Sequence, residues 1–217
     1  MAKKTVAQLL IETLVAAGVK RVFGVAGDSL SSIIDTIRTR KDIVWIPVGH
    51  EEVGAFAAGA EAHLTGSLAV CAGSCGPGNL HLINGLYDCH RSRVPVLAIA
   101  AHIPSNEIGS NYFQETHPER LFLECSHYCE LVSQPSQMPR TLEIAIQTAI
   151  SRKGVSVVVL PGDIALKEAT TQQPRLRFRL TEPLLRPSDS DLFNLADTLD
   201  SAEKVTILGR SRMRRRA

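Results

Sequence analysis

Short apolar runs alternate along the chain with longer stretches in which apolar residues recur every three or four positions. The apolar runs are the predicted strands, at residues 21–25, 43–47, 68–72, 95–101, 127–132 and 155–160. The periodic stretches are the predicted helices, at residues 6–17, 29–38, 50–64, 79–90, 119–124 and 138–153. This regular alternation predicts an α/β fold with a doubly wound, mostly parallel six-stranded sheet.

The pattern changes at the end of the first predicted domain, residues 1–166. Residues 167–187 are rich in proline, threonine and glutamine, a composition typical of a linker. Residues 188–209 contain a predicted helix and then an apolar run at 205–208 that is followed by a glycine, as at the start of another α/β domain. We therefore expect an incomplete second α/β domain, followed by an arginine-rich tail at 210–217.

The overall composition is that of an ordinary globular protein, with 44% hydrophobic and 21% charged residues. No apolar run reaches the roughly 18–20 residues needed to cross a bilayer. The first residues also lack the apolar segment of a secretory signal. A cytoplasmic location is therefore expected.

Positive charge is concentrated at the C-terminus, because five arginines lie within residues 210–217 while the rest of the chain is mildly acidic. Such a cluster either binds nucleic acid or is an abnormal, out-of-frame end of the chain. Binding of nucleic acid requires a basic face on the fold itself. No nucleic-acid partner is therefore expected.

The chain has five cysteines, an odd number, and they include two pairs with C-x3-C spacing. Without a secretory signal, this number argues against a framework of disulfide bonds. The spacing also differs from the C-x2-C of common zinc sites. We expect structural thiols and no metal site in this chain.

Two glycine-bearing turns each join a predicted strand to a predicted helix, at residues 24–29 and 76–79. Each is either a tight turn only or a place where the backbone approaches a ligand at the start of a helix. Neither turn has the spacing of a dinucleotide fingerprint or of a nucleotide phosphate loop.

A histidine and two glutamates, His50, Glu51 and Glu52, open the most alanine-rich helix. Carboxylates in a first helical turn commonly serve only to complement the helix dipole. The apolar residues that follow predict a buried helix, however. A glutamate buried there would be able to exchange a proton near neutral pH, because burial penalises the charged form.

Three motifs in order resemble one family. They are V-F-G-V-A-G-D-S at 22–29, H-E-E-V-G-A-F-A-A-G-A-E-A at 50–62 and A-G-S-C-G-P-G-N-L-H-L-I-N-G at 72–85. Together they resemble the thiamin-diphosphate enzymes of the pyruvate oxidase and acetolactate synthase group. Residues 100–118 and 125–132 resemble the branch of bacterial pyruvate dehydrogenases that pass electrons to quinone, and the similarity covers about residues 4–209.

The resemblance implies a PYR domain, which binds the pyrimidine half of thiamin diphosphate. It implies that Glu51 is the catalytic residue, hydrogen-bonded to the pyrimidine ring. The residues implied to bind the cofactor are Gly27, Glu51, Pro77, Gly78 and Asn79. Phe113 and Gln114 are implied to lie near the substrate.

For a full-length protein the resemblance implies a homo-oligomeric enzyme that decarboxylates pyruvate to acetate and CO2. Electrons would pass through FAD to quinone at the inner face of the cell membrane. This chain has no G-D-G followed by the Asn of the family's Mg²⁺–diphosphate motif, and the FAD domain stops after one predicted strand. Mg²⁺, FAD, quinone and the membrane are therefore expected to involve only the full-length enzyme. We expect this chain to be an inactive fragment, ended by a truncation or frameshift near residue 209.

Two other functions stay open. One is a carboligase fragment like that of acetolactate synthase, which the run at residues 100–118 disfavours. The other is a non-catalytic dimerisation or binding module, since PYR domains pair in the family. One departure is local: Gly49 stands where members of this branch often have arginine, which puts one ion pair in doubt but not Glu51.

Overall fold

The computed structural model describes residues 3–171 and 186–206. By compactness the chain divides into two units, Met1–Glu182 and Pro183–Ala217. Among the described residues, no helix is long and apolar enough to cross a membrane. Part of the predicted linker (172–185) and the predicted tail (210–217) lie outside the described residues.

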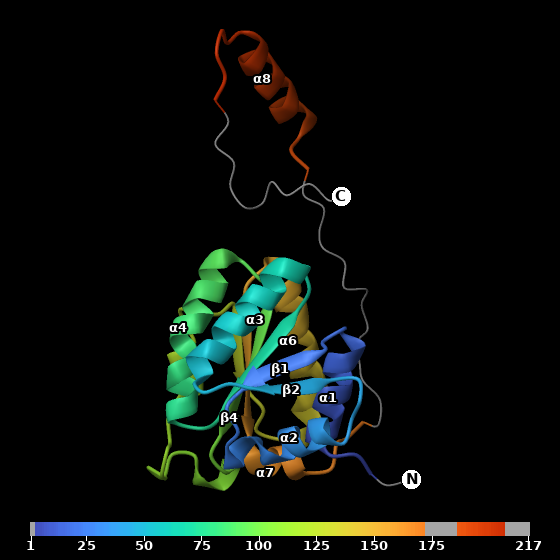
Figure 1. The fold of residues 1–217 in the computed structure, drawn as a ribbon, viewed down its shortest axis with the longest axis vertical. Helices are drawn as coiled ribbons and strands as arrows, with labels where there is room; N and C mark the ends of the chain where they lie inside the picture. The colour runs from blue at the N-terminus through green and yellow to red at the C-terminus, as the bar shows by residue number, and fades with distance from the viewer. Residues whose placement is uncertain (1–2, 172–185, 207–217) are drawn as a thin grey trace. The chain divides into compact units, whose positions relative to one another are not determined.

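The first unit is built on one six-stranded sheet in which every strand runs parallel to its neighbours, in the order β2-β1-β3-β4-β6-β5 (Figure 1). The strands are β1 (Arg21–Gly24), β2 (Val44–Pro47), β3 (Ala69–Gly73), β4 (Val96–His102), β5 (Tyr128–Leu131) and β6 (Val155–Pro161). The predicted doubly wound α/β fold is confirmed, and the sheet is wholly parallel rather than mostly parallel.

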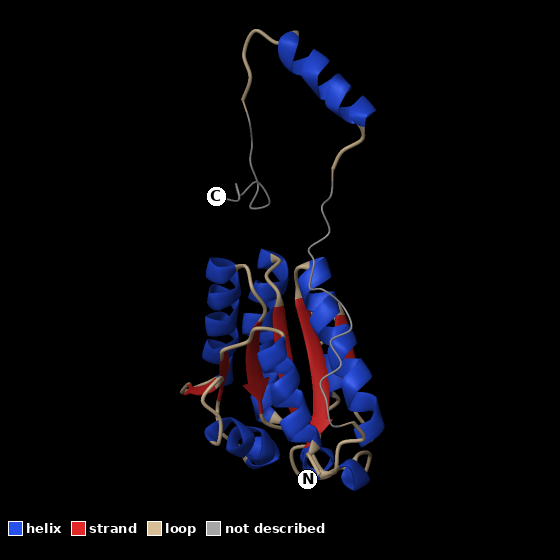
Figure 2. Cartoon of the chain, turned by 90° about the vertical axis from the view of Figure 1, so that its right-hand side faces the viewer, coloured by secondary structure: helices blue, strands red, loops and turns tan. Residues whose placement is uncertain are grey.

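Helices cover both faces of the sheet: Figure 1 shows helices on either side of the strands, and the turned view of Figure 2 looks onto one face, with helices in front of the strands. The helices on one face are α1 (Val6–Ala16), α2 (Ser31–Arg38), α6 (Met138–Arg152) and α7 (Gly162–Leu166). Those on the other face are α3 (Glu51–Thr65), α4 (Pro77–Ser92) and the short α5 (Pro118–Leu121). Each layer encloses its own apolar core, one containing Leu10 and Ile33, the other Ala55 and Leu82.

The central strands are apolar except for Ser156 and His102, because both of their faces are covered. Every residue of β4 and of β6 is buried, and the two strands pair over seven positions. Alternate side chains enter opposite cores: Val70 of β3 lies in the first and Cys71 in the second. This double burial explains why the strands appear in the sequence as continuous apolar runs rather than as alternating ones.

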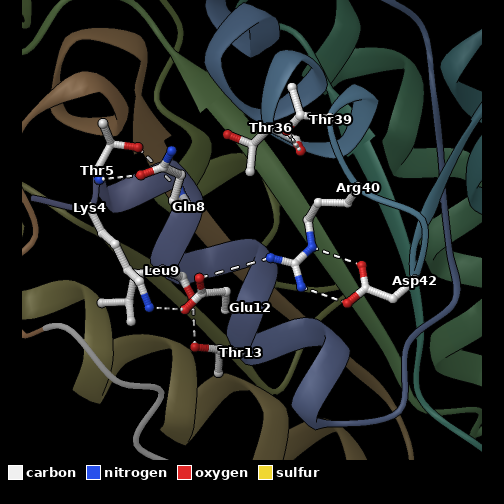
Figure 3. Close-up of polar contacts among 10 residues, drawn as sticks. All are labelled: Lys4, Thr5, Gln8, Leu9, Glu12, Thr13, Thr36, Thr39, Arg40 and Asp42. Carbon is white, nitrogen blue, oxygen red and sulfur yellow. Dashed lines mark hydrogen bonds and ion pairs between the residues drawn. The ribbon is translucent and has the colours of Figure 1, made fainter. Parts of the chain in front are cut away.

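The first helix begins at a capping box, in which Thr5 Oγ1 accepts from the Gln8 backbone N–H and the Gln8 side chain accepts from the Thr5 N–H (Figure 3). Residues on both sides of this cap form backbone hydrogen bonds with residues 167 and 169. The Val6 N–H donates to Lys167 O at 2.9 Å, and the Ala169 N–H donates to Lys4 O at 2.8 Å. The first residues of the predicted linker are therefore bound to the start of α1.

A polar network joins α1 to the connection between α2 and β2 (Figure 3). The Glu12 carboxylate lies 2.8 Å from Lys4 Nζ and 3.9 Å from the Arg40 guanidinium. Arg40 also donates two hydrogen bonds to Asp42 and thereby lowers the pKa of that carboxyl. The bidentate geometry fixes the orientation of the guanidinium between the two carboxylates.

Most predicted elements are present within a few residues of their expected ends, but three differ. The helix α7 was not predicted, because a single turn leaves too few residues to show periodicity. The helix expected at 119–124 is shorter, α5 (Pro118–Leu121). Val205 and Thr206 lie outside any strand, and the other two residues of the strand predicted at 205–208 lie outside the described residues.

The described part of the second unit contains one helix, α8 (Asp189–Asp200). Ser188 caps it, since Ser188 Oγ accepts from the Asp191 N–H at 3.2 Å. None of its residues is buried, and Leu192 and Phe193 are exposed. The helix itself agrees with the prediction.

The substitution Gly85→Ala is expected to lower the free energy of unfolding by about 1–3 kcal/mol, the usual range for overpacking. An added Cβ would lie 2.5 Å from Ala55 Cβ and 2.9 Å from the backbone oxygen of Glu52. Because backbone cannot move aside as a side chain can, α3 and α4 would have to separate.

Chemical denaturation of the variant and the parent chain measures this difference. The matched control is Gly49→Ala, because a Cβ there meets no atom within 4 Å. Equal stability of the two variants would contradict the tight packing of α3 on α4.

Candidate functional site

The candidate site lies at the carboxyl ends of β1 and β3, where the order of the strands reverses. From β1 the chain continues to β2 on one side, and from β3 it continues to β4 on the other. Ligands of open parallel sheets bind at such a switch point. The loops that follow the two strands meet there, because a Cβ added to Gly27 would lie 2.7 Å from Ser74 Cβ.

Of the two adjacent glutamates, Glu51 is the buried one, with 7% of its surface exposed. It is the first residue of α3, after the cap His50, whose Nδ1 accepts from the Glu52 backbone N–H at 3.3 Å. Glu52 instead turns toward Asn84 of α4, which donates to it. The sequence left open whether these residues only complement the helix dipole; the structure assigns the buried position to Glu51.

The buried carboxylate lies against the second glycine-bearing turn. A Cβ added to Gly78 would lie 2.9 Å from Glu51 Oε1 and 2.6 Å from Ser74 Oγ. Pro77 is exposed and stands at the first helical position of α4, where its missing N–H has no effect on the helix. The structure therefore brings together Glu51 and Gly78, two of the predicted site residues.

Asn79 is fully buried and connects the start of α4 to the end of β4. Its Nδ2 donates to Ala101 O at 2.8 Å, while its Oδ1 has no partner among the described residues. An unpaired buried acceptor is uncommon in native structures. The hydrogen bond that is present gives Asn79 a role in holding α4 on the sheet.

The loop between β4 and α5 carries the two residues expected near the substrate. Gln114 has a left-handed φ of 64°, its Oε1 accepts from Cys75 Sγ at 3.4 Å, and its Cβ would be 2.7 Å from a Cβ on Gly76. Gln114 therefore lies on the glycine turn. Phe113 lies on the surface instead, with 79% of its area exposed.

The glycines of the site are required by protein packing. Gly27, Gly76 and Gly78 each leave space that neighbouring protein atoms fill, as the contacts with Ser74, Gln114 and Glu51 show. Gly76 also has a φ of 68°, which favours glycine. Both interpretations of the two turns thus stay compatible with the structure, since close packing of loops does not exclude a ligand beside them.

His81 is a site residue that the sequence interpretation missed. Its Nδ1 lies 3.1 Å from Glu51 Oε2, and its ring stacks on that of His50 with centroids 4.2 Å apart. Residues three apart share a face of a helix, so the position of Gly78 beside Glu51 implies His81 beside it as well. This spacing was the available signal, and it needed only the assumption that the two motifs meet.

The buried cysteines are not candidate nucleophiles. Burial raises the pKa of the Cys89 thiol to about 12 and that of Cys125 to about 11. Nucleophilic attack needs the thiolate, which these values suppress near neutral pH. All five cysteines are free thiols.

Comparison with known proteins gives one family and several relatives. Residues 4–121 match the family model described as thiamine pyrophosphate enzyme, N-terminal TPP binding domain. The chain is 63% identical over 209 residues to an uncharacterized 42.6 kDa protein in the isoamylase 3′ region of Pseudomonas amyloderamosa, which covers 96% of this chain and 53% of that protein.

Two enzymes are also similar. Pyruvate oxidase of Lactiplantibacillus plantarum is 35% identical over 201 residues, covering 91% of this chain and 33% of the enzyme. Acetolactate synthase of Mycobacterium bovis is 29% identical over 205 residues, covering 94% of this chain and 33% of that enzyme. The chain thus spans about half of the first relative and a third of these two enzymes.

Acidification is expected to loosen the loop that carries Gln114. Backbone N–H groups lower the pKa of Glu115 by donating to its carboxylate. The N–H of Gly109 has the largest effect, and those of Tyr112 and Asn111 contribute less. A carboxyl with a lowered pKa stabilises the folded loop above its ordinary pKa, and this stabilisation is lost as the pH falls through the lowered value.

Amide hydrogen exchange at Gly109 and Tyr112 tests this, after correction for the intrinsic pH dependence of exchange. In the Glu115→Gln variant these two amides should exchange faster than in the parent chain at neutral pH. The acid-induced rise in their exchange rate should be absent from the variant. Glu107→Gln in the same loop is the control, and the same change in both variants would argue against Glu115 as the anchor.

Proposed function

The chain belongs to the thiamine pyrophosphate enzymes as their N-terminal TPP-binding domain, and we propose that Glu51 hydrogen-bonds the pyrimidine ring of the cofactor. Thiamine pyrophosphate is thiamin diphosphate. The observation that carries the proposal is a buried carboxylate at the switch point of the sheet, in contact with the glycine turn at residues 76–79. Gly27, Pro77, Gly78 and Asn79 would border the pyrimidine.

The residues present suit the pyrimidine half of the cofactor. A carboxyl group in an apolar setting strongly favours a hydrogen-bonding partner, because burial without one is unfavourable. His81 Nδ1 contacts one oxygen of the Glu51 carboxylate, Oε2, at 3.1 Å. The other oxygen lies next to Gly78, where the absence of a side chain keeps the carboxylate close to the loop.

The role of this chain in such a reaction is to hold the ring and a proton. The cofactor, when bound, supplies the site that accepts the electron pair released by decarboxylation. Glu51 would hold a proton at the ring nitrogen, and the buried alanine-rich face of α3 would exclude water around it. Phe113 and Gln114 would approach the substrate from the loop after β4.

For the full-length protein we propose oxidation of pyruvate to acetate and CO2, with electrons passing through FAD to quinone. The resemblance of residues 100–118 to the quinone-linked pyruvate dehydrogenases supports this proposal. Percentage identity does not separate the two reactions, since it is 35% to a pyruvate oxidase and from 29% to 35% to acetolactate synthases. Mg²⁺, FAD and the membrane contact would involve parts of a longer protein, and this chain alone would not turn over pyruvate. Acetolactate as the product of the full-length protein would favour the carboligase instead.

A self-pairing function has support from the surface of α3 and α4. Val53 and Phe56 of α3 and Leu80 and Tyr87 of α4 are large apolar side chains that are exposed. Contiguous exposed apolar surface commonly marks an interface. We propose that a second copy of the chain covers this face, as expected for a homo-oligomeric family.

Glu51→Gln is expected to weaken binding of thiamin diphosphate about ten- to hundredfold. This range corresponds to loss of one hydrogen bond to a charged group, about 1.5–3 kcal/mol. Ligand-observed NMR with the cofactor and Mg²⁺ detects weak binding to this chain.

The matched control is Glu52→Gln, since the neighbouring carboxylate points to Asn84. Equal weakening in both variants would contradict the assignment of Glu51, and pyruvate turnover by this chain alone would contradict its inactivity.

Phe56→Glu is expected to convert a self-paired chain into a monomer, because a charge would be buried in the apolar interface. Analytical ultracentrifugation measures the molecular mass in solution. Leu64→Glu, at the exposed far end of α3, is the control and should leave pairing intact. A monomeric parent chain would overturn the proposal.

A further inference from the structure

Three potential metal ligands from two helices converge beside the glycine turn. His50 caps α3, Glu51 is its first residue, and His81 lies in the second turn of α4. One ligand atom from each lies within 4.8 Å of the others, and no other such group of three occurs among residues 3–171 and 186–206. His50 and Glu51 are neighbours in the sequence, whereas His81 comes from a different helix. The packing of α3 on α4 therefore creates the cluster.

We propose that His50, Glu51 and His81 form a binding site for a divalent transition-metal ion such as Zn²⁺. Two imidazoles and one carboxylate are a known ligand set for zinc with an open fourth position. Mg²⁺ and Ca²⁺ prefer oxygen ligands, so this set selects against them.

The spacing of the donor atoms suits a tetrahedral ion. With metal–ligand bonds of about 2.0–2.2 Å, two ligand atoms of one tetrahedron lie about 3.4 Å apart. His81 Nδ1 and Glu51 Oε2 are 3.1 Å apart, which already fits. The His50 ring must turn out of its stack on His81 before one of its nitrogens can point at the same ion, because two nearly parallel rings do not direct their nitrogens at one point. The half-exposed position of His50 leaves room for this turn.

The surroundings of the cluster also suit a bound cation. The Glu51 carboxylate is buried, and within the described part of the chain it pairs with an imidazole rather than with a lysine or arginine. A divalent ion would compensate the charge, and the exposed rings leave a side open for water.

A second carboxylate is in place to orient His50. Glu52 Oε2 lies 3.9 Å from His50 Nδ1, and Asn84 holds the other oxygen of Glu52. When His50 Nε2 binds a metal, Nδ1 carries the proton, so Nδ1 gives up the cap hydrogen bond that it accepts from the Glu52 N–H and donates to this carboxylate instead. A carboxylate behind a metal-binding histidine is the usual arrangement of metal sites.

The site goes beyond the proposed function, although it shares Glu51 with it. The Glu51 carboxylate can bind either a metal ion or the pyrimidine ring, but not both at once. The test below contains no thiamin, so its failure and the failure of the proposed function are distinguishable.

The experiment titrates the untagged chain with CoCl2 and follows the visible absorption bands of the ion, then displaces the cobalt with ZnCl2. We expect one tightly bound ion per chain with the intense bands of a tetrahedral site. His81→Ala and Glu51→Gln should each weaken binding about tenfold or more, since even changes to outer partners of metal ligands reach about 10–100-fold.

His63→Ala is the matched control, because it removes a histidine from the last turn of the same helix α3. It should leave the affinity unchanged. Equal affinity of His81→Ala and the parent chain, or the same loss in His63→Ala, would overturn the proposal. Thermal unfolding of each variant without metal confirms that the fold is retained.

X-ray absorption at the zinc edge identifies the ligand atoms. The proposal requires nitrogen and oxygen neighbours at about 2.0–2.2 Å and no sulfur, whose bond to zinc is about 2.3 Å. A sulfur neighbour would instead assign the ion to a cysteine such as the half-buried Cys75 and overturn the site.

Discussion

The close packing of α3 on α4 is the constraint on which the site depends. It places the first turn of α3 against the first two turns of α4, with the Glu51 carboxylate between Gly78 and His81. The approach requires glycine at Gly85, where an added Cβ would lie 2.5 Å from Ala55 Cβ and 2.9 Å from the backbone oxygen of Glu52. At Gly59 an added Cβ would lie 2.6 Å from Cys89 Sγ, so that thiol would have to move. Small residues on two adjacent helices thus decide whether a charged group becomes buried, because any larger residue would separate the helices and admit water.

The sequence predicted the sheet well because parallel strands covered on both faces are continuous apolar runs. β4 and β6 are buried at every position, and their runs are apolar from end to end except for Ser156 and His102. Short elements were predicted less well. A single helical turn such as α7 contains less than one repeat of the apolar pattern, so periodicity carries no information about it.

The candidate site was predictable in part. The apolar pattern after the H-E-E motif indicated a buried carboxylate, and only the family resemblance pointed to Glu51 rather than Glu52. The pattern alone could not choose, because the choice depends on how α3 is rotated against α4. The same rotation directs Glu52 toward Asn84 and brings His81 to Glu51. For Phe113 the resemblance gave the position along the loop but not the direction of the side chain, which is exposed in this chain. Packing between elements distant in sequence decides each of these outcomes, and local patterns do not encode it.

A buried carboxylate with one histidine partner is chemically versatile. Because burial without a partner is unfavourable, Glu51 favours any group that offers a proton or a positive charge at the open side of the site. A flat heterocycle with a protonated nitrogen satisfies this requirement, and so does a divalent cation held together with His50 and His81. The family assignment gives reason to expect the first, while the ligand set gives reason to expect the second. Both follow from the same geometric fact, that one end of α3 is packed so that little of its first carboxylate is left in contact with water.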